Sequence, residues 1–345
     1  MGRLTRSDIA AAYQLLLGRE PESKDTIDAH LKQDSAAALL KALAESEEFQ
    51  RRWQRSPFYH FNTVLDPEAI IRAHADPARI AKPGHLVNFL GVAMNRAFMP
   101  HLKHSDNAVE GLPIPANWHA DMAEFAASLR AVDLARDRFA MIELGCGWGC
   151  WMNNTGVAAK RRGLSIHVTG VEGDEGHLAF AREALATNGI AAGEYTLHHG
   201  IAGAEPGSAL FPRQSRSGRD WGLEARPNAA LDARNWAMRR NRYESIDILA
   251  LDDIVGTETR IDLLHMDIQG GEAVLIRDCL ETLNSKIAYL VVGTHSRAIE
   301  GYLMTLLLDA GWTLEIERPS IFEIKRRGPQ TTVDGLQGWR NPRLA

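Results

Sequence analysis

The sequence predicts an α/β domain with a mainly parallel sheet, preceded by a small all-α module. Three observations lead to this fold class: a glycine-rich turn after a buried strand, an acid at the end of the next strand, and strand and helix patterns that alternate over residues 118–327. Such alternation is typical of parallel sheets, because each parallel crossover needs a long connection that is usually a helix.

The glycine-rich turn follows an apolar run over residues 139–144, which predicts a buried strand. The turn contains three glycines, Gly145, Gly147 and Gly149. Glycines let the backbone turn tightly and approach a ligand where a side chain would collide. The helix expected from Cys150 onward would direct its free N–H groups at that ligand. The spacing differs from the dinucleotide-binding Gly-x-Gly-x-x-Gly, because Cys150 stands where the third glycine would be.

The second strand, residues 165–171, leads into Glu172 and then Asp174. An acid at the tip of the second strand of a βαβ unit is placed to accept both hydroxyls of an adenosine ribose. A helix-like run from His177 to Thr187 closes the unit. This order of elements resembles the S-adenosylmethionine site of the Rossmann-like class I methyltransferases. The resemblance implies S-adenosylmethionine as cofactor, held by residues near the turn, namely Glu143, Gly145, Gly147, Gly149, Glu172 and Asp174.

Three further motifs follow in order along the chain: Leu251-Asp252-Asp253, Asp267 to Glu272, and Val291 to His295. With the glycine turn they resemble the FkbM-type methyltransferases from about residue 117 to 327. That family implies O-methylation of sugars and polyketide-type natural products. The chain has His265 and Gln269 where the family often has Lys and Glu, and Gly293-Thr294 where a Glu often precedes the histidine. These departures lie where an acceptor would sit, so its class is not carried over.

The predicted catalytic residues are His295, Asp267 and Gln269. Asp267 and His295 end the fourth and fifth strands, and ligands in open α/β sheets bind at the carboxyl ends of strands. Methyl transfer needs an aligned nucleophile and, for an alcohol, removal of its proton. We expect His295 to be the base because imidazole titrates near neutral pH, with Asp267 orienting it or binding the acceptor. His265, deeper on the same strand face, is expected to pack in the core.

The alternative is a structural role for these residues. His295 would then be a buried histidine whose hydrogen bonds are made within the protein, and Asp267 an anion at a helix N-terminus. No metal is predicted, although a metal-assisted reaction stays open because Asp267, Glu272 and His295 are ligand types. His198 and His199 are neighbours on a strand and point to opposite faces, which argues against a shared ion.

The predicted function is an S-adenosylmethionine-dependent O-methyltransferase acting on a hydroxyl of a sugar, glycan or glycan precursor. One alternative is methylation of a polyketide- or peptide-type natural product. Another is a methyltransferase-fold binding or scaffold protein without turnover. A dehydrogenase is disfavoured by the glycine spacing, and nucleobase amino-methylation by the absence of an Asn/Asp-Pro-Pro-aromatic stretch.

Four segments are predicted. Residues 1–55 form a helical module that resembles the DUF4214 family at residues 15–21 and 46–49, which implies a docking or glycan-associated role, or only packing. Residues 56–117 form an irregular, proline-rich connector that could cover the cofactor. Residues 118–327 form the methyltransferase domain, with a C-terminal antiparallel hairpin of residues 313–317 and 321–325. Residues 328–345 form a loose polar tail.

Residues 205–245 interrupt the domain as an insert without regular periodicity, and long inserts often bind ligands. The insert holds eight arginines and five acids, a balance of +3 in a chain of net charge −5. The arginines predict contact with an anionic acceptor, and Trp221 and Trp236 offer flat apolar surface that could stack on a sugar or another ring. The alternative is a solvated loop with locally paired arginines.

The composition limits the classes of binding partner that can be expected. A net charge of −5 over 345 residues provides no general attraction to nucleic acid or anionic membrane. No apolar run is long enough to span a bilayer, and the first residues lack a secretory pattern. The three cysteines form no disulfide framework. A cytoplasmic protein with a small-molecule or glycan acceptor is expected, and a homo-oligomer is left open.

Overall fold

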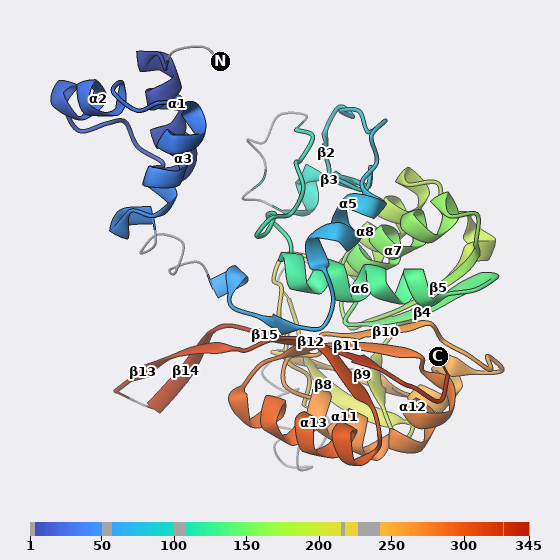
Figure 1. The fold of residues 1–345 in the computed structure, drawn as a ribbon. Helices are drawn as coiled ribbons and strands as arrows, with labels where there is room; N and C mark the ends of the chain where they lie inside the picture. Colours follow the sequence, from blue (N-terminus) through green and yellow to red (C-terminus); the bar gives the residue numbers. More distant parts are fainter. Residues whose placement is uncertain are drawn as a thin grey trace. The chain divides into compact units, whose positions relative to one another are not determined.

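The chain forms two compact units, residues 1–60 and residues 61–345 (Figure 1). The computed structural model describes residues 4–49, 57–99, 102, 108–214, 218–226, 242–326 and 328–344. Among these residues, no helix is long and apolar enough to cross a bilayer.

The first unit is helical, as predicted. Its helices are α1 (Arg6–Leu17), α2 (Lys24–His30) and α3 (Ala36–Ala44), followed by the short helix η1 (Pro57–Tyr59). Thr5, Ser23 and Ser35 cap the three longer helices by accepting a backbone N–H with their hydroxyls, which satisfies donors that a helix start leaves free. The unit has its own apolar core, formed by Leu4, Ile9, Ala12, Tyr13, Leu17, Leu39 and Leu43.

The second unit is organised around an eight-stranded sheet of order β1-β12-β15-β11-β10-β4-β5-β6. Five neighbouring strands are parallel: β11 (Tyr289–Thr294), β10 (Leu263–Met266), β4 (Arg138–Leu144), β5 (Ser165–Glu172) and β6 (Tyr195–His199). Three strands at the other end pair antiparallel: β15 (Gly335–Arg340), β12 (Thr313–Arg318) and β1 (Asn62–Thr63). This arrangement confirms the predicted mainly parallel α/β sheet, and it makes β10 and β11 neighbours.

Helices cover both faces of this sheet (Figure 1). One face carries α5 (Pro67–His74), α6 (Met122–Leu134), α7 (Cys150–Arg161) and α8 (Glu175–Thr187). The other carries α10 (Leu251–Val255), α11 (Glu272–Asp278), α12 (Leu280–Lys286) and α13 (Arg297–Asp309). Strand β4 shows why two layers form. Phe139 and Met141 enter one apolar core, whereas Ala140, Ile142 and Leu144 enter the other, because successive side chains of a strand point to opposite faces.

The segment 56–117 is not the irregular connector that the prolines predicted. Besides β1 and α5 it contains the hairpin β2 (His85–Val87) and β3 (Ala93–Asn95), and the short helix η2 (Arg96–Phe98). Ile71, Phe89 and Leu90 are buried in the core under α6. The prolines limit the length of each element, but the apolar residues between them still pack. The predicted boundary at residue 117 is therefore wrong, because the compact unit begins at residue 61.

The insert between β6 and β10 folds in part. The short helix η4 (Ala192–Glu194) precedes β6, and after β6 the strands β7 (Ile201–Gly203), β8 (Gly207–Pro212) and β9 (Tyr243–Ala250) form a small sheet with β9 in the middle. Residues 215–217 and 227–241 lie outside the described residues, and with them Arg216, Arg234, Arg239, Arg240 and Trp236.

The C-terminal prediction was partly wrong. Both hairpin strands exist, but β12 pairs with β15, and β13 (Ile321–Lys325) pairs instead with β14 (Gly328–Val333). The predicted loose tail thus supplies two strands, one of which lies between β11 and β12. Within it, Trp339 is fully buried, and its indole donates to the buried amide oxygen of Gln337 at 3.1 Å. Polar residues of this strand are satisfied by tertiary contacts that its sequence does not show.

Candidate functional site

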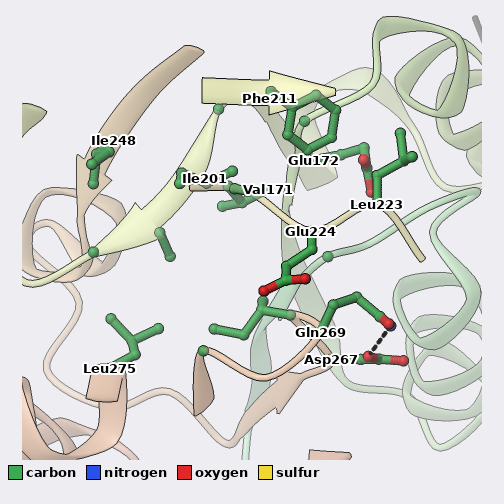
Figure 2. A pocket seen from close by; sticks show the side chains of 18 of the residues that line it. Val171, Glu172, Ile201, Phe211, Leu223, Glu224, Ile248, Asp267, Gln269 and Leu275 are labelled. Carbon is green, nitrogen blue, oxygen red and sulfur yellow. Dashed lines mark hydrogen bonds between the residues drawn. The ribbon is translucent and has the colours of Figure 1, made fainter. Parts of the chain in front are cut away.

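A cavity of about 570 Å³ opens where β4, β5 and β10 end (Figure 2). Its walls come from the glycine turn, the end of β5, the insert and the turn between β10 and α11. The residues that bear on function are Gly145, Gly147, Glu172, His177, Trp221, Glu224, Asp267 and Gln269.

Two glycines allow the turn to make close contacts. Gly145 has φ 76°, and a Cβ there would lie 2.0 Å from the carbonyl oxygen of Asp267. Only glycine fits at such a position, where both the dihedral angle and the contact exclude a side chain. Gly147 has φ 53° and lies under the indole of Trp221, which a Cβ would approach to 2.8 Å. The turn therefore brings the ends of β4 and β10 together at the cavity.

Glu172 ends β5 and faces the cavity, as predicted. Its Oε2 accepts the N–H of Gly147 at 2.8 Å, and its Oε1 accepts the N–H of Asp174 at 2.9 Å. The side chain is 11% exposed. His177 Nδ1 also lies 3.7 Å from the same Oε1. A carboxylate offers about four acceptor sites, so acceptor capacity remains for a ligand in the cavity while the backbone holds the group in place.

Three of the predicted cofactor residues do not line the cavity. Glu143 is buried, and its two oxygens accept the N–H groups of Trp151 at 3.2 Å and Met152 at 2.9 Å, which caps the start of α7. Burial raises the pKa of Glu143 to about 8, although those two hydrogen bonds oppose the rise. Gly149 has φ 73° and forms the N-cap of α7. The third residue, Asp174, caps α8.

Asp174 also ties the insert to α8, which sequence analysis did not anticipate. Its Oδ1 accepts the N–H of His177 at 3.0 Å and of Gly218 at 2.7 Å. Its Oδ2 accepts the side-chain amide of Gln214 at 2.8 Å. The insert is thereby held beside the glycine turn.

Trp221 is held in this position. Its ring stacks on His177 with centroids 3.9 Å apart and an interplanar angle of 21°. His177 was missed as a site residue, and its place in the first turn after the strand-end acid was the signal available. Trp221 was expected to stack on a sugar or another ring, and here its ring stacks on His177 and lies over Gly147.

The predicted catalytic residues come together. Asp267 directly follows β10, its side chain is 49% exposed, and it lines the cavity. The side-chain amide of Gln269 donates to Asp267 Oδ1 at 2.9 Å (Figure 2). Gln269 has φ 57°, a left-handed conformation that is strained for any residue other than glycine. On the other side, His295 Nε2 lies 3.2 Å from Asp267 Oδ1.

Glu272 contacts the other nitrogen of His295. It is fully buried, its Oε1 accepts the N–H groups of Ile268 and Gly270 at 3.1 Å, and the same oxygen lies 2.9 Å from His295 Nδ1. Burial lowers the pKa of His295, but the carboxylates of Asp267 and Glu272 outweigh it and raise the pKa to about 10. For Asp267, burial alone would raise the pKa, but the neighbouring His295 outweighs burial, so the pKa of Asp267 lies below its ordinary value.

The raised pKa argues against the expectation that His295 accepts a proton near neutral pH. With a pKa of about 10, the imidazole already carries its proton there. The expectation for His265 agrees with the structure: it is buried, its Nε2 lies 3.2 Å from Glu124 Oε1, and its ring stacks on Trp151.

The described lining of the cavity contains none of the arginines that predicted an anionic acceptor, which stays a prediction. Arg213 lies 3.6 Å from Glu244, Arg219 lies 3.9 Å from Asp220, and neither lines the cavity. Among the described residues, the charged side chains of the lining, apart from His177, are acids, namely Glu172, Glu205, Glu224, Asp267 and Asp278. Four of the eight arginines of the insert, namely Arg216, Arg234, Arg239 and Arg240, lie outside the described residues.

The connector was also expected to cover the cofactor. None of its described residues lines the cavity.

The strand order and the site together define a class I methyltransferase: a parallel run, one antiparallel strand set between β11 and β12, a glycine turn after β4 and an acid ending β5. The profile of the methyltransferase FkbM domain matches residues 135–332, more than half of the chain. The chain belongs to this family of methyltransferases. The match does not include the N-terminal helical module.

A protein of Jannaschia sp. (strain CCS1), named "Putative methyltransferase", is 42% identical over 265 residues, which cover 76% of this chain and 95% of that protein. Among solved structures, the methyltransferase FkbM from Methylobacillus flagellatus KT aligns with TM-score 0.37 and 16% identity, over 62% of this chain and 54% of that one. The METTL16 methyltransferase domain aligns with TM-score 0.37 and 13% identity, over 80% and 96%.

Proposed function

We propose that the chain transfers a methyl group from S-adenosylmethionine to a hydroxyl of a sugar, glycan or glycan precursor. The observation that carries this proposal is that Glu172 and Asp267 open onto one cavity, with the backbone of Gly145 between them. A ribose-binding acid and a polar group for the acceptor are thus held on one rigid sheet edge.

The residues present fit the cofactor. Glu172 has acceptor capacity left for the ribose hydroxyls, and the turn at Gly145 and Gly147 has no side chain to obstruct a close approach. An apolar wall suited to adenine is formed by Val171, Ile201, Phe211, Leu223 and Ile248. When bound, S-adenosylmethionine supplies an electrophilic methyl group on a positively charged sulfur.

Asp267 is the residue placed to bind the acceptor hydroxyl. Gln269 and His295 both contact its Oδ1, so the carboxylate is oriented before the acceptor arrives. An oriented hydrogen-bond acceptor aligns the hydroxyl oxygen for in-line displacement and receives its proton. His295 holds Asp267 and does not itself remove the proton.

The acceptor is inferred to be neutral or cationic. The charged wall residues other than His177 are acids among the described residues, and an acidic wall repels carboxylates and phosphates. A neutral, hydroxyl-rich sugar meets this condition without needing an opposite charge.

Calorimetry with S-adenosylmethionine and with S-adenosylhomocysteine tests the cofactor site. Glu172→Ala should weaken binding by about 1–3 kcal/mol, because it removes charged hydrogen bonds. Glu175→Ala is the matched control, since this acid lies three residues away, is 81% exposed and does not line the cavity. Equal affinities for both variants and the unchanged protein would place the cofactor elsewhere.

Transfer of a labelled methyl group tests the acceptor. A panel of neutral sugars, aminosugars and sugar phosphates should show product with the first two and little with the phosphates. Tight cofactor binding without product on any sugar, together with product on a polyketide, would replace the proposed acceptor class.

A further inference from the structure

Three ligand-type side chains meet below the cavity. Asp267, Glu272 and His295 each offer an atom within 4.8 Å of the others, and in the described part of the chain no other group of three or more such side chains does so. The three residues come from the end of β10, the start of α11 and the end of β11, so the sheet itself sets their spacing.

The histidine ring is held by one carboxylate on each side. Nδ1 faces Glu272 Oε1 at 2.9 Å, and Nε2 faces Asp267 Oδ1 at 3.2 Å. Glu272 is fully buried and anchored by two backbone N–H groups, so it fixes the orientation of the ring. Histidines that bind metals commonly direct their second nitrogen at such a carboxylate. Nε2 is thereby left to face Asp267.

The two nitrogens of His295 lie within ion-pair distance of carboxylates, but the buried polar atoms of this group are not all hydrogen-bonded. Glu272 Oε2 makes no hydrogen bond, and neither nitrogen of His295 makes a hydrogen bond of regular geometry within the described structure. A buried polar atom without a partner is costly, and a bound cation would satisfy the nitrogen that faces Asp267.

The spacing between the two inner atoms also fits one ion. Two ligand atoms that are each about 2.1 Å from a metal lie about 3.0 Å apart at a right angle and about 3.4 Å apart at the tetrahedral angle. The distance of 3.2 Å between His295 Nε2 and Asp267 Oδ1 falls between these limits. The Gln269 amide, 2.9 Å from the same Oδ1, can turn its oxygen inward, because amide oxygen and nitrogen are assigned only from their contacts.

We propose that this group binds a divalent transition-metal ion. Asp267 and His295 Nε2 are its ligands, with the Gln269 amide oxygen as a third, and Glu272 orients His295 from the outer shell. Mixed imidazole and carboxylate ligands suit ions such as Mn²⁺ or Zn²⁺. The ion would take the place of the proton on Nε2, beside the cavity that Asp267 lines.

The role of the ion rests on the proposed function. When bound, the ion would act as a Lewis acid that makes an acceptor hydroxyl in the cavity easier to deprotonate. The proton passes to the free oxygen of Asp267 and then to solvent. The acceptor oxygen forms a bond to the methyl carbon, the carbon–sulfur bond breaks, and its electron pair returns to sulfur.

Mn²⁺ binding to the full chain, treated with a chelator and dialysed, tests the site. Calorimetry and the electron paramagnetic resonance of Mn²⁺ should show one ion per chain. His295→Ala and Asp267→Asn should abolish binding, and Glu272→Gln should weaken it by about 10–100-fold. His199→Ala is the matched control, because His199 is also exposed beside a carboxylate, with its Nδ1 3.9 Å from Glu175 Oε1. This variant should bind the ion as tightly as the unchanged chain.

S-adenosylhomocysteine binding, measured on the same samples, separates this proposal from the proposed function. Cofactor binding without Mn²⁺ binding would overturn the metal site and leave the ion pair between His295 and Asp267 as the account. Mn²⁺ binding that persists in His295→Ala would also overturn it, as adventitious binding elsewhere. Loss of the ion in the variants, with cofactor affinity and thermal unfolding unchanged, supports the site even if no acceptor is found.

Discussion

Glu143 and Glu172 stand at the ends of neighbouring strands, yet their carboxylates meet different surroundings. Glu143 turns into the protein and caps α7, whereas Glu172 turns to the cavity. The sequence predicted both as cofactor residues, because both lie close to the glycine turn. Spacing places a carboxylate near a turn, but it does not tell which backbone N–H groups reach that carboxylate first.

The buried position of Glu143 predicts a pH dependence of stability. Its pKa is about 8 in the folded chain, against an ordinary value of 4.5. Because the folded pKa is the higher one, the folded state keeps the proton while the unfolded state loses it. The contribution to the free energy of unfolding is therefore complete below pH 4.5 and is lost as the pH rises to 8.

Urea unfolding of the unchanged chain and of Glu143→Gln between pH 5 and pH 8 measures this effect. The unchanged chain should lose stability more steeply than the variant, by at most about 1.4 kcal/mol per pH unit for one proton. Burial also raises the pKa values of Asp121 and of the half-buried Glu110, but these two acids titrate in both proteins and cancel in the difference. Parallel curves would show that Glu143 is ionised in the folded state.

Strands that are apolar along their length and end in a polar residue could be predicted from the sequence. Strands that are held mainly by tertiary contacts could not. Asp267 and His295 follow apolar runs, so the sequence placed them at adjacent strand ends, and the structure agrees. Strand β15 has no such signal. Its Gly338 fits because a Cβ would lie 2.6 Å from a methyl carbon of Ile316, and its Gln337 is buried. Glycine and glutamine predict a loop until these neighbours are known.

The insert is the element whose predicted role changes most. Glu224 projects into the cavity near Gln269 (Figure 2), whereas Arg213 and Arg219 pair locally. We expect Glu224→Gln to raise the acceptor KM by about 10–100-fold, the loss of about 1.5–3 kcal/mol from one charged hydrogen bond. Arg213→Ala and Arg219→Ala should leave the acceptor KM unchanged.

Steady-state kinetics with the best acceptor of the panel checks this expectation, with S-adenosylhomocysteine affinity measured beside it. A weaker affinity for S-adenosylhomocysteine in Glu224→Gln would assign the residue to the cofactor instead. A raised KM in the arginine variants would restore the anionic acceptor.

At the scale of the molecule, the two units differ in what they need from the rest of the chain. Residues 1–60 have their own core, with caps at all three longer helices. The second unit depends on its far C-terminus, because β15 pairs with β11 at six positions and also with β12. Length and position along the chain are therefore poor guides to which terminal segment the catalytic unit needs.

Two truncations test this difference. A chain of residues 61–345 loses 60 residues but keeps every strand of the large sheet, so it should fold and bind S-adenosylhomocysteine with the affinity of the full chain.

A chain of residues 1–334 loses only 11 residues. It leaves the backbone groups of β11 and β12 that pair with β15 without those partners, and it removes Leu336 and the fully buried Trp339. Removing one buried tryptophan side chain alone costs about 3–5 kcal/mol, and a domain has only about 5–15 kcal/mol in total. Circular dichroism of the chain of residues 1–334 should therefore show no cooperative unfolding transition for the second unit. A cooperative transition with retained cofactor binding in residues 1–334 would mean that β15 is dispensable, and failure of residues 61–345 to fold would mean that the helical module supports the catalytic unit.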